Sequence, residues 1–203
     1  MIKTLGKLFA RLVASHVELH PTETCAHCGS QLARERDEPN SDWCCLNPDC
    51  PPEVLRRVAL WVSPEAMDIP ACDAGLVKQL MERGLVRDAV EFYQLSVAEL
   101  VGLEGMSEAK ARALIAEIEA SKERKAWRVL AGLGIRHLGG AAAQALCGQF
   151  HSLHELFAAG RNQMLVITGV DEVVVRQLKR WLGDPVNRKL VRRLAKAGVN
   201  FNC

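Results

Sequence analysis

Apolar positions recur every three or four residues through most of this chain, which is the pattern of amphipathic helices packed around a core. The pattern is continuous from residue 53 to residue 203, with a break at Asp184-Pro185 and a stop at Gly198. The main apolar stripes comprise Leu76, Val77 and Leu80; Ala111, Leu114, Ile115 and Ile118; Val174, Val175, Leu178, Trp181 and Leu182; and Leu190, Leu194 and Ala197. We therefore predict a mainly α fold for residues 53–203.

The segment 1–21 carries a separate amphipathic pattern. Its apolar residues share one helical face over residues 2–13, with Lys3, Lys7 and Arg11 elsewhere, and Pro21 ends the segment. Such a helix can lie on a membrane surface. We expect it instead to pack on the rest of the chain or on a protein partner.

A second pattern is a five-residue frame whose first and fourth places are apolar. It occurs at 69–73, 103–107, 135–139 and 167–171, so successive frames begin 34, 32 and 32 residues apart. A regular period of this size marks stacked supersecondary units. A generic helical solenoid such as a tetratricopeptide array has a similar period, but glycine at defined places of the frame favours helical hairpins.

The third frame, Ile135-Arg136-His137-Leu138-Gly139, lies between two runs of good helix formers, 126–130 and 141–146. We expect the two apolar residues to plug the groove between the helices, and Gly139 to supply a left-handed backbone. The second helix then offers N–H groups at its N-terminus, which suits a phosphate. This arrangement is typical of a helix-hairpin-helix motif, which binds the nucleic-acid backbone through its own main-chain N–H groups.

Residues 22–52 have a different character. Cys25 and Cys28 are separated by two residues, and Gly29 follows them. Sixteen residues lie between Cys28 and Cys45, and Cys50 completes the set. Four thiolates close a tetrahedral zinc site that stabilises folding and leaves no open position for catalysis. We predict a small four-cysteine zinc finger here, a mainly α array of four hairpins after it, and domains at 1–21, 22–52 and 53–203.

Two residues leave the ligand set open. Cys44 adjoins Cys45, which we prefer because 45–50 forms the more regular knuckle, and His27 would serve only if a cysteine failed. The chain has eight cysteines, but their metal-like spacing and the lack of an apolar signal sequence disfavour a disulfide framework. We therefore expect the cytoplasm, where thiols stay reduced.

Charge adds a local signal and no global one. The formal net charge is only +2, so nucleic-acid contacts would come from local basic patches. Residues 176–196 contain eight basic residues against the single acid Asp184: Arg176, Lys179, Arg180, Arg188, Lys189, Arg192, Arg193 and Lys196. Aromatic residues are few, which disfavours base stacking on single strands. The apolar runs are too short to span a membrane.

Several motifs resemble the bacterial NAD-dependent DNA ligase over residues 22–201. They are Cys25 to Leu32, Trp43 to Pro51, Ala66 to Ile69, Gly134 to Gly139 and Ala197 to Phe201. The resemblance is to that enzyme's four-cysteine finger and helix-hairpin-helix domain, which encircle nicked duplex DNA. It implies a DNA-binding protein of replication or repair that contacts DNA backbone and holds structural zinc.

The resemblance does not extend to the ligase chemistry. The family takes up AMP on the lysine of a Lys-x-Asp-Gly motif, which this sequence lacks, so we expect neither NAD binding nor nick sealing from this chain alone. One alternative is part of a ligase acting with a separate adenylating subunit. Another is a protein-interaction scaffold with degenerate hairpins, whose partner docks on the N-terminal helix.

The family usually carries glycine at the fifth frame place, where this chain has Asp73, Ser107, Gly139 and Asp171. We expect a carboxylate there to repel phosphate. The second and third hairpins are then the DNA grips, the fourth is weakened and the first is structural; a structural role for all four stays open. The expected DNA-binding residues are Gly105, Ser107, Arg136, His137, Gly139, Gly169, Arg176, Lys179 and Arg180.

Overall fold

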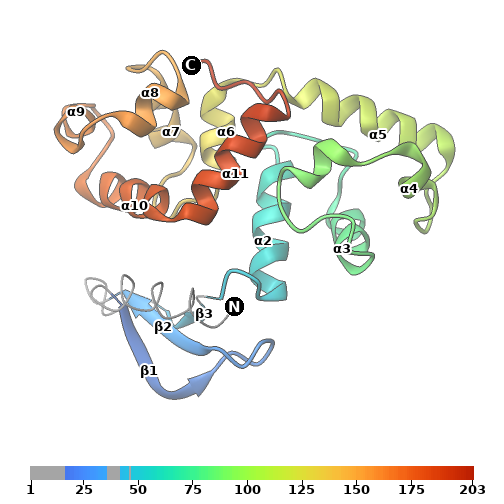
Figure 1. Cartoon of the computed structure of the whole chain (residues 1–203), viewed down its shortest axis with the longest axis horizontal. Helices are drawn as coiled ribbons and strands as arrows, with labels where there is room; N and C mark the ends of the chain where they lie inside the picture. The colour runs from blue at the N-terminus through green and yellow to red at the C-terminus, as the bar shows by residue number, and fades with distance from the viewer. Residues whose placement is uncertain (1–16, 36–41, 46) are drawn as a thin grey trace. The chain divides into compact units, whose positions relative to one another are not determined.

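The computed structural model describes residues 17–35, 42–45 and 47–203 (Figure 1). These described residues divide into two compact units, with the boundary between Val54 and Leu55. The predicted helix at 2–13 lies outside the described residues. Within them, no helix is both long enough and apolar enough to cross a membrane.

The first unit contains a three-stranded antiparallel sheet in the order β1 (Val17–Thr24), β2 (Gln31–Glu35) and β3 (Cys44–Cys45). Thr24 pairs with Gln31, and the register shifts between this pair and the pair of Leu19 with Ala33. Residues 17–21, which the sequence pattern assigned to the N-terminal segment, therefore belong to the sheet. The reason is that β1 and β2 are joined by the tight turn of the first cysteine knuckle.

Helix α2 (Pro51–Val62) begins directly after Cys50, two residues before the start that the sequence pattern predicted. Proline is accepted in the first turn of a helix because the N–H that it lacks has no partner inside the helix. The N–H of Val54 donates to the Cys50 carbonyl over 2.9 Å. The last cysteine of the first unit is thus part of the first turn of α2.

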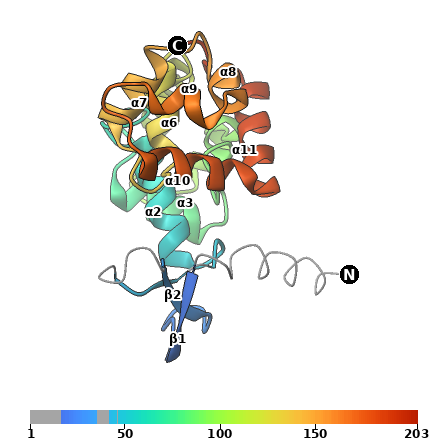
Figure 2. The same cartoon turned by 90° about the vertical axis from the view of Figure 1, so that its left-hand side faces the viewer.

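The second unit is helical throughout, which confirms the predicted mainly α class (Figures 1 and 2). Its elements after α2 are α3 (Ala74–Glu82), the 3-10 helix η1 (Glu91–Gln94), α4 (Val97–Val101), α5 (Glu108–Ser121), α6 (Ala126–Gly132), α7 (Gly140–Cys147), α8 (Leu153–Ala158), α9 (Arg161–Leu165), α10 (Glu172–Gly183) and α11 (Pro185–Lys196). The four frames join α2 to α3, α4 to α5, α6 to α7, and α9 to α10. Each frame is therefore the turn between two helices.

The apolar places of the frames are core positions. Seven of the eight side chains are buried, and the eighth, Met106, is half-buried; the seven are Ile69, Cys72, Leu103, Ile135, Leu138, Ile167 and Val170. Burying such a side chain contributes about 1.5–3 kcal/mol. The plugs fix each turn on its two helices and leave the polar places between them outside.

The last residues of the chain tie distant helices together. The N–H of Asn200 donates to the Lys122 carbonyl after α5 over 2.8 Å, and Leu153 of α8 donates to the Phe201 carbonyl over 2.9 Å. Asn202 pairs with Ser152 as an isolated β-bridge. This segment therefore joins the end of α5 to the start of α8 within the second unit.

The contact between α6 and α2 leaves no room for a side chain at Gly132. A Cβ there would lie 2.9 Å from Cε3 of Trp61 and 3.0 Å from the Cβ of Ala66, and both of these residues are fully buried. We predict that Gly132→Ala lowers the free energy of unfolding by about 1–3 kcal/mol despite the better helix propensity of alanine, because the core is overpacked. Urea unfolding measures this.

Gly183→Ala is the matched control, because a Cβ at the end of α10 meets nothing within 4 Å. It should leave stability within about 0.5 kcal/mol or raise it slightly. Equal stability of the two variants would contradict the close packing of α6 on α2.

Candidate metal centre and nucleic-acid interface

The four cysteines of the predicted finger come together at one end of the sheet. Their Sγ atoms all lie within 4.8 Å of one another, with 3.7 Å between Cys25 and Cys50 and 3.4 Å between Cys28 and Cys45. Tetrahedral zinc with Zn–S bonds of about 2.3 Å holds its sulfurs about 3.8 Å apart. The cluster therefore has the dimensions of a closed structural zinc site.

Local backbone geometry explains how two distant cysteine pairs converge. In the first knuckle Gly29 has φ +69° and donates its N–H to the Cys25 carbonyl, while Cys25 donates to the Ser30 carbonyl. In the second knuckle the N–H of Cys50 donates to the Asn47 carbonyl over 3.1 Å. Pairing of β2 with β3 brings the two knuckles side by side, because Leu32 lies opposite Cys45.

The electrostatics of the four thiols fit a cation. Hydrogen bonds from the Ser30 hydroxyl and backbone, and from the Asn47 side chain, lower the pKa of Cys28 to about 5. Burial and the neighbouring sulfurs raise the pKa of Cys50 to about 12, and burial also raises that of Cys45. Four thiolates this close repel one another unless a metal ion neutralises them. The donor set is therefore suited to zinc.

Neither alternative ligand joins this cluster. The Cys44 thiol points to the Ala33 carbonyl, 3.3 Å away, and His27 is exposed. Alternation along β3 explains the difference, because Cys44 and Cys45 face opposite sides of the strand. Of the other cysteines, Cys72 is buried, and Cys147 lies 2.8 Å from Cys203 between their Sγ atoms.

The fifth place of each frame is the N-cap of the following helix. The prediction of a left-handed residue at this place is wrong. Gly139 has φ −87° and ψ −179°, and the three other N-caps are also extended. Asp73, Ser107 and Asp171 accept hydrogen bonds from the N–H groups of Leu76, Lys110 and Val174. No backbone strain therefore attaches to aspartate here; aspartate and serine are favoured caps.

The left-handed residue is instead the third place of the second, third and fourth frames. Gly105 has φ +71°, His137 φ +60° and Gly169 φ +86°. Histidine is among the residues that adopt this region more readily. The first frame has Ala71 at this place, and its N–H donates to the Glu117 carboxylate over 2.9 Å. That turn amide is already satisfied within the protein, as expected for a structural hairpin.

The third hairpin differs from the others in charge and in capping. The sequence has no acidic residue between Glu123 and Glu155, and Arg136, His137 and Gly139 are all exposed. Gly139 offers no side-chain cap to the N–H groups that open α7. No residue of 124–154 can therefore bring a carboxylate to the positive end of this helix dipole.

The second hairpin has an exposed turn like the third, but it also has acidic neighbours. Gly105 and Ser107 are exposed, but so are the carboxylates of Glu104 and Glu108 beside them. The ammonium group of Lys110 donates to the Gly105 carbonyl over 3.1 Å. Its turn is accessible, yet its surroundings are more acidic than those of the third hairpin.

The basic residues predicted on α10 are held by the protein. Arg176, Lys179 and Arg180 are half-buried, and the Lys179 ammonium donates to the carbonyls of Phe157 and Ala159 at the end of α8. Burial lowers the pKa of Lys179. The carbonyl end of α8 thus uses this lysine as a cap, a role that sequence spacing does not reveal.

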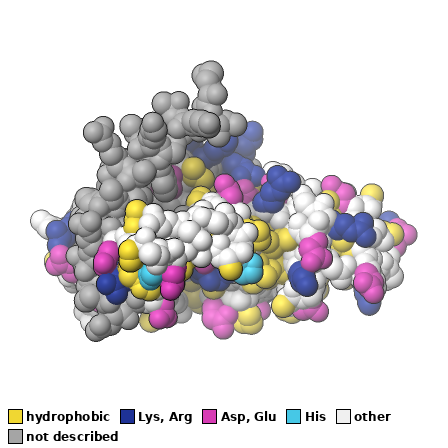
Figure 3. Space-filling model, turned by 90° about the horizontal axis from the view of Figure 1, so that it is seen from below, with side chains coloured by type: hydrophobic (Ala, Val, Ile, Leu, Met, Phe, Trp, Pro, Cys, Tyr) yellow, Lys and Arg dark blue, Asp and Glu magenta, His cyan; other side chains and the backbone are white. Residues whose placement is uncertain are grey.

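Charge is unevenly spread over the face drawn in Figure 3. Lysine and arginine side chains gather at the upper centre of that view, whereas basic and acidic side chains alternate over its right-hand half. The formal net charge of the whole sequence is only +2. Local patches, and not the whole surface, are thus available to an anion.

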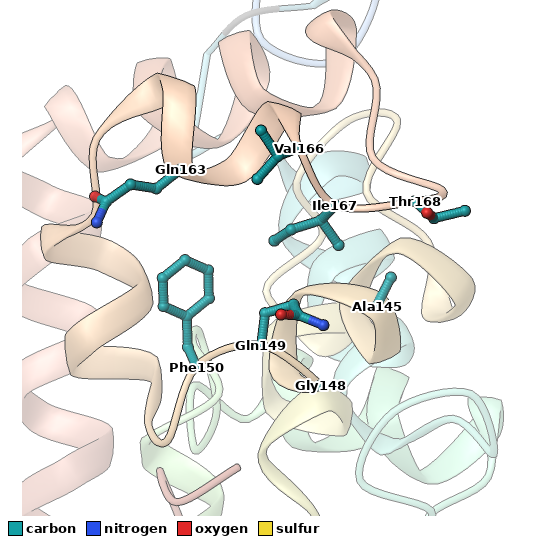
Figure 4. Close-up of a pocket in the computed structure, with 8 residues that line it drawn as sticks. All are labelled: Ala145, Gly148, Gln149, Phe150, Gln163, Val166, Ile167 and Thr168. Atoms are coloured by element: carbon teal, nitrogen blue, oxygen red, sulfur yellow. The ribbon is translucent and has the colours of Figure 1, made fainter.

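An open pocket of about 450 Å³ lies between the end of α7 and the turn that leads into α10 (Figure 4). Phe150 stands on one side of it, and Gln149 and Ile167 stand on the other. Its lining contains no charged side chain. The pocket therefore offers no positively charged side chain to an anion.

Known sequences agree with this geometry. The family described as "Helix-hairpin-helix motif" matches residues 128–191. The DNA ligase of Rubrobacter xylanophilus is 39% identical over 184 residues, which is 91% of this chain and 27% of the relative. The chain is homologous to one region of DNA ligases.

Two further relatives extend the match to nearly every residue. DNA ligase 2 of Deinococcus deserti is 35% identical over 98% of this chain, and the DNA ligase of Parasynechococcus marenigrum is 32% identical over 99%. Each match covers 30% of the relative. The ligase-like chain thus spans less than a third of the length of these curated relatives. Its four-cysteine cluster and hairpin array both fall inside the matched region.

Adjacent cysteines offer a sharp test of the metal centre. We predict that Cys45→Ser weakens zinc binding at least about tenfold, because it removes one of four thiolates from a closed site. Cys44→Ser should keep one zinc per chain at unchanged affinity. Competition with a chromogenic chelator measures both variants, and zinc loss from Cys44→Ser alone would overturn the assignment.

Proposed function

We propose that this chain binds duplex DNA without regard to sequence, chiefly through the main chain of its third hairpin. The helix-hairpin-helix motif and the DNA ligase relatives support DNA binding in a ligase-like region. The observation that carries the proposal is the exposed N-terminus of α7, which has no side-chain cap and lies in a stretch without acidic residues. We infer that a DNA phosphate takes the place of the missing cap.

The chemistry of this turn suits a phosphate. The first N–H groups of a helix have no partner inside it, and the helix dipole adds partial positive charge at the same place. The first bond inside α7 runs from the N–H of Ala143 to the Gly139 carbonyl, over 2.9 Å. The amides before Ala143 are then available to an anion, with the exposed Arg136 next to the turn. Hydrogen bonds of this kind reach phosphates and not bases, so they carry no sequence preference.

The remaining hairpins rank below the third for the same reason. Asp73 and Asp171 bring a carboxylate to the helix N-terminus, where it occupies an N–H and repels a phosphate. Ser107 is an uncharged cap, so the second hairpin would bind a phosphate more weakly than the third. We propose that the third hairpin dominates affinity, with a lesser contribution from Gly105 and Ser107. Gly169 lies in the turn that Asp171 follows and contributes least of the exposed turns.

We propose zinc as the ion of the Cys25, Cys28, Cys45 and Cys50 cluster. The ion would join the two knuckles and neutralise the thiolates, and it would supply no catalytic chemistry because all four positions are filled by protein. The sheet of the first unit is small, and among the described residues of this unit only Ala33, Cys50 and Val54 are buried and apolar. Metal binding would therefore contribute a large part of the folding free energy of this unit.

The motif resemblance to the NAD-dependent DNA ligase supports a second, more specific proposal. We propose that the bound duplex is nicked and that this region serves an NAD-dependent DNA ligase in replication or repair. The 203 residues contain no Lys-x-Asp-Gly motif, so adenylation would be performed by another polypeptide segment. Nick sealing with NAD, measured with this chain alone and mixed with an adenylating ligase fragment, tests this statement separately from DNA binding.

Titration of labelled duplexes at several salt concentrations tests the central proposal. Affinity should fall steeply with salt, by about 0.9 in the logarithm of the binding constant per contacted phosphate for each tenfold rise. Duplexes of unrelated sequence should bind equally, and a nicked duplex at least as tightly as an intact one. No binding at low salt would overturn the proposal and leave a protein-interaction scaffold as the alternative.

A substitution at Gly139 isolates the hairpin contact. A Cβ at this residue meets nothing within 4 Å, so both Gly139→Asp and Gly139→Asn should fold with stability within about 0.5 kcal/mol of the original. We predict that Gly139→Asp lowers duplex affinity about tenfold, because a carboxylate caps α7 as Asp171 caps α10. Fluorescence anisotropy measures the affinity.

Gly139→Asn separates the two causes of the loss. The amide caps the helix without charge, so its affinity should lie between those of the original chain and Gly139→Asp. Equal affinities of all three proteins would show that α7 does not meet phosphate.

A further inference from the structure

Helix α11 carries an exposed basic face that the hairpin contacts do not use. Arg188, Lys189, Arg192 and Lys196 are all exposed, while Val191 and Leu194 are buried on the opposite side of the helix. Side chains four residues apart share one helical face, so Arg188, Arg192 and Lys196 follow one line. We call these four basic residues the α11 basic face.

The four cations differ from most of the other basic side chains of the second unit in their surroundings. None of them forms an ion pair with another residue that the structure describes. By contrast, Arg112, Lys122, Arg124 and Arg161 pair with carboxylates, and Lys179 is held by carbonyls. Positive charge is therefore neutralised locally in many places but left uncompensated on α11.

Two acidic residues that contact α11 have partners outside this face. Asp184 is the sole acidic residue between 176 and 196, and its carboxylate accepts the N–H of Val186 at the start of α11. Asp88 pairs with Arg193, which is half-buried and lies outside the face. The four cations consequently face solvent as one block of like charge.

We propose that the α11 basic face is a second contact surface for the backbone of duplex DNA, separate from the hairpin main chain. From Arg188 to Lys196 the helix rises about 12 Å, and duplex DNA carries about seven phosphate charges over that length. The face therefore meets enough anions to engage all four side chains. This inference rests on the proposed function and adds a site that acts through charged side chains instead of amides.

Two features favour duplex backbone over other polyanions. Residues 185–196 contain no aromatic side chain, so the face offers no platform for the bases of a single strand. Helix α11 follows α10, the second helix of the fourth hairpin, after the single residue Asp184, and its Val191 and Leu194 are buried, so the charges are held on a helix that is fixed in the second unit. A helix that is fixed by its buried side presents its four charges in a constant arrangement.

The test replaces all four residues with glutamine: Arg188→Gln, Lys189→Gln, Arg192→Gln and Lys196→Gln in one chain. The slope of log affinity against log salt should become shallower by about 3 to 4, at about 0.9 per lost phosphate contact. Affinity for a labelled duplex at about 0.1 M salt should fall at least about tenfold. Circular dichroism and urea unfolding verify that the original chain and the quadruple variant are both folded.

A matched control removes the same amount of charge elsewhere on the second unit. Lys78, Arg83, Arg87 and Lys125 are exposed, and replacing all four with glutamine should change the slope by less than about 1. Equal losses in the two variants would mean that only net charge matters, and would overturn the proposal. The single variant Arg192→Gln, with an expected slope change of about 0.9, serves if a quadruple variant does not fold.

The remaining outcomes separate this inference from the proposed function. This inference alone is overturned if the original chain binds duplex DNA and the Gly139→Asp substitution lowers its affinity, whereas the four α11 substitutions do not. No binding by the original chain overturns both. Competition by polyglutamate that is lost in the α11 variant while duplex binding persists would assign the face to an acidic protein partner, and so would also overturn it.

Discussion

The first-turn N–H groups of the hairpin helices are the constraint on which this molecule depends. A helix N-terminus must find acceptors, and a side chain at the N-cap and a DNA phosphate compete for the same groups. In the first and fourth hairpins an aspartate has taken that place, and in the second a serine has. In the third hairpin Gly139 has no side chain that could accept a hydrogen bond from these N–H groups. The same turn thus yields three hairpins with a side-chain cap at the helix N-terminus and one hairpin without such a cap.

Burial of the frame residues explains why the same turn can serve both purposes. Ile135 and Leu138 are buried between α6 and α7, whereas Arg136 and His137 between them are exposed. The turn is anchored by its apolar places and needs no ligand to keep its shape. Ligand binding can therefore change from hairpin to hairpin by substitution at the N-cap without loss of the array. In the first unit we propose that a metal ion at the four-cysteine cluster has the corresponding role, since the sheet has a small apolar core.

Much of this organisation was predictable because it depends on local patterns. Helical periodicity gave the mainly α class, and the spacing of the frames gave the positions of the four turns. The choice of Cys45 over Cys44 followed from the regularity of the second knuckle, and the strand then placed the two thiols on opposite sides. The conformation of the fifth place was predicted wrongly, because glycine there suggested a left-handed residue while the left-handed residue is two places earlier. Aspartate at that place should have indicated an N-cap.

The sequence by itself determined the mainly α class, the frames and the four metal-type cysteines, because each follows from local patterns along the chain. Only the tertiary structure decided which charges are available. Lys179 donates to carbonyls at the end of α8, and Arg193 pairs with Asp88. The turn of the first hairpin donates an N–H to Glu117. Each of these partners lies more than 15 residues away in the chain. Spacing cannot reveal such partners, because a charge meets its counterpart only after helices from distant segments have packed.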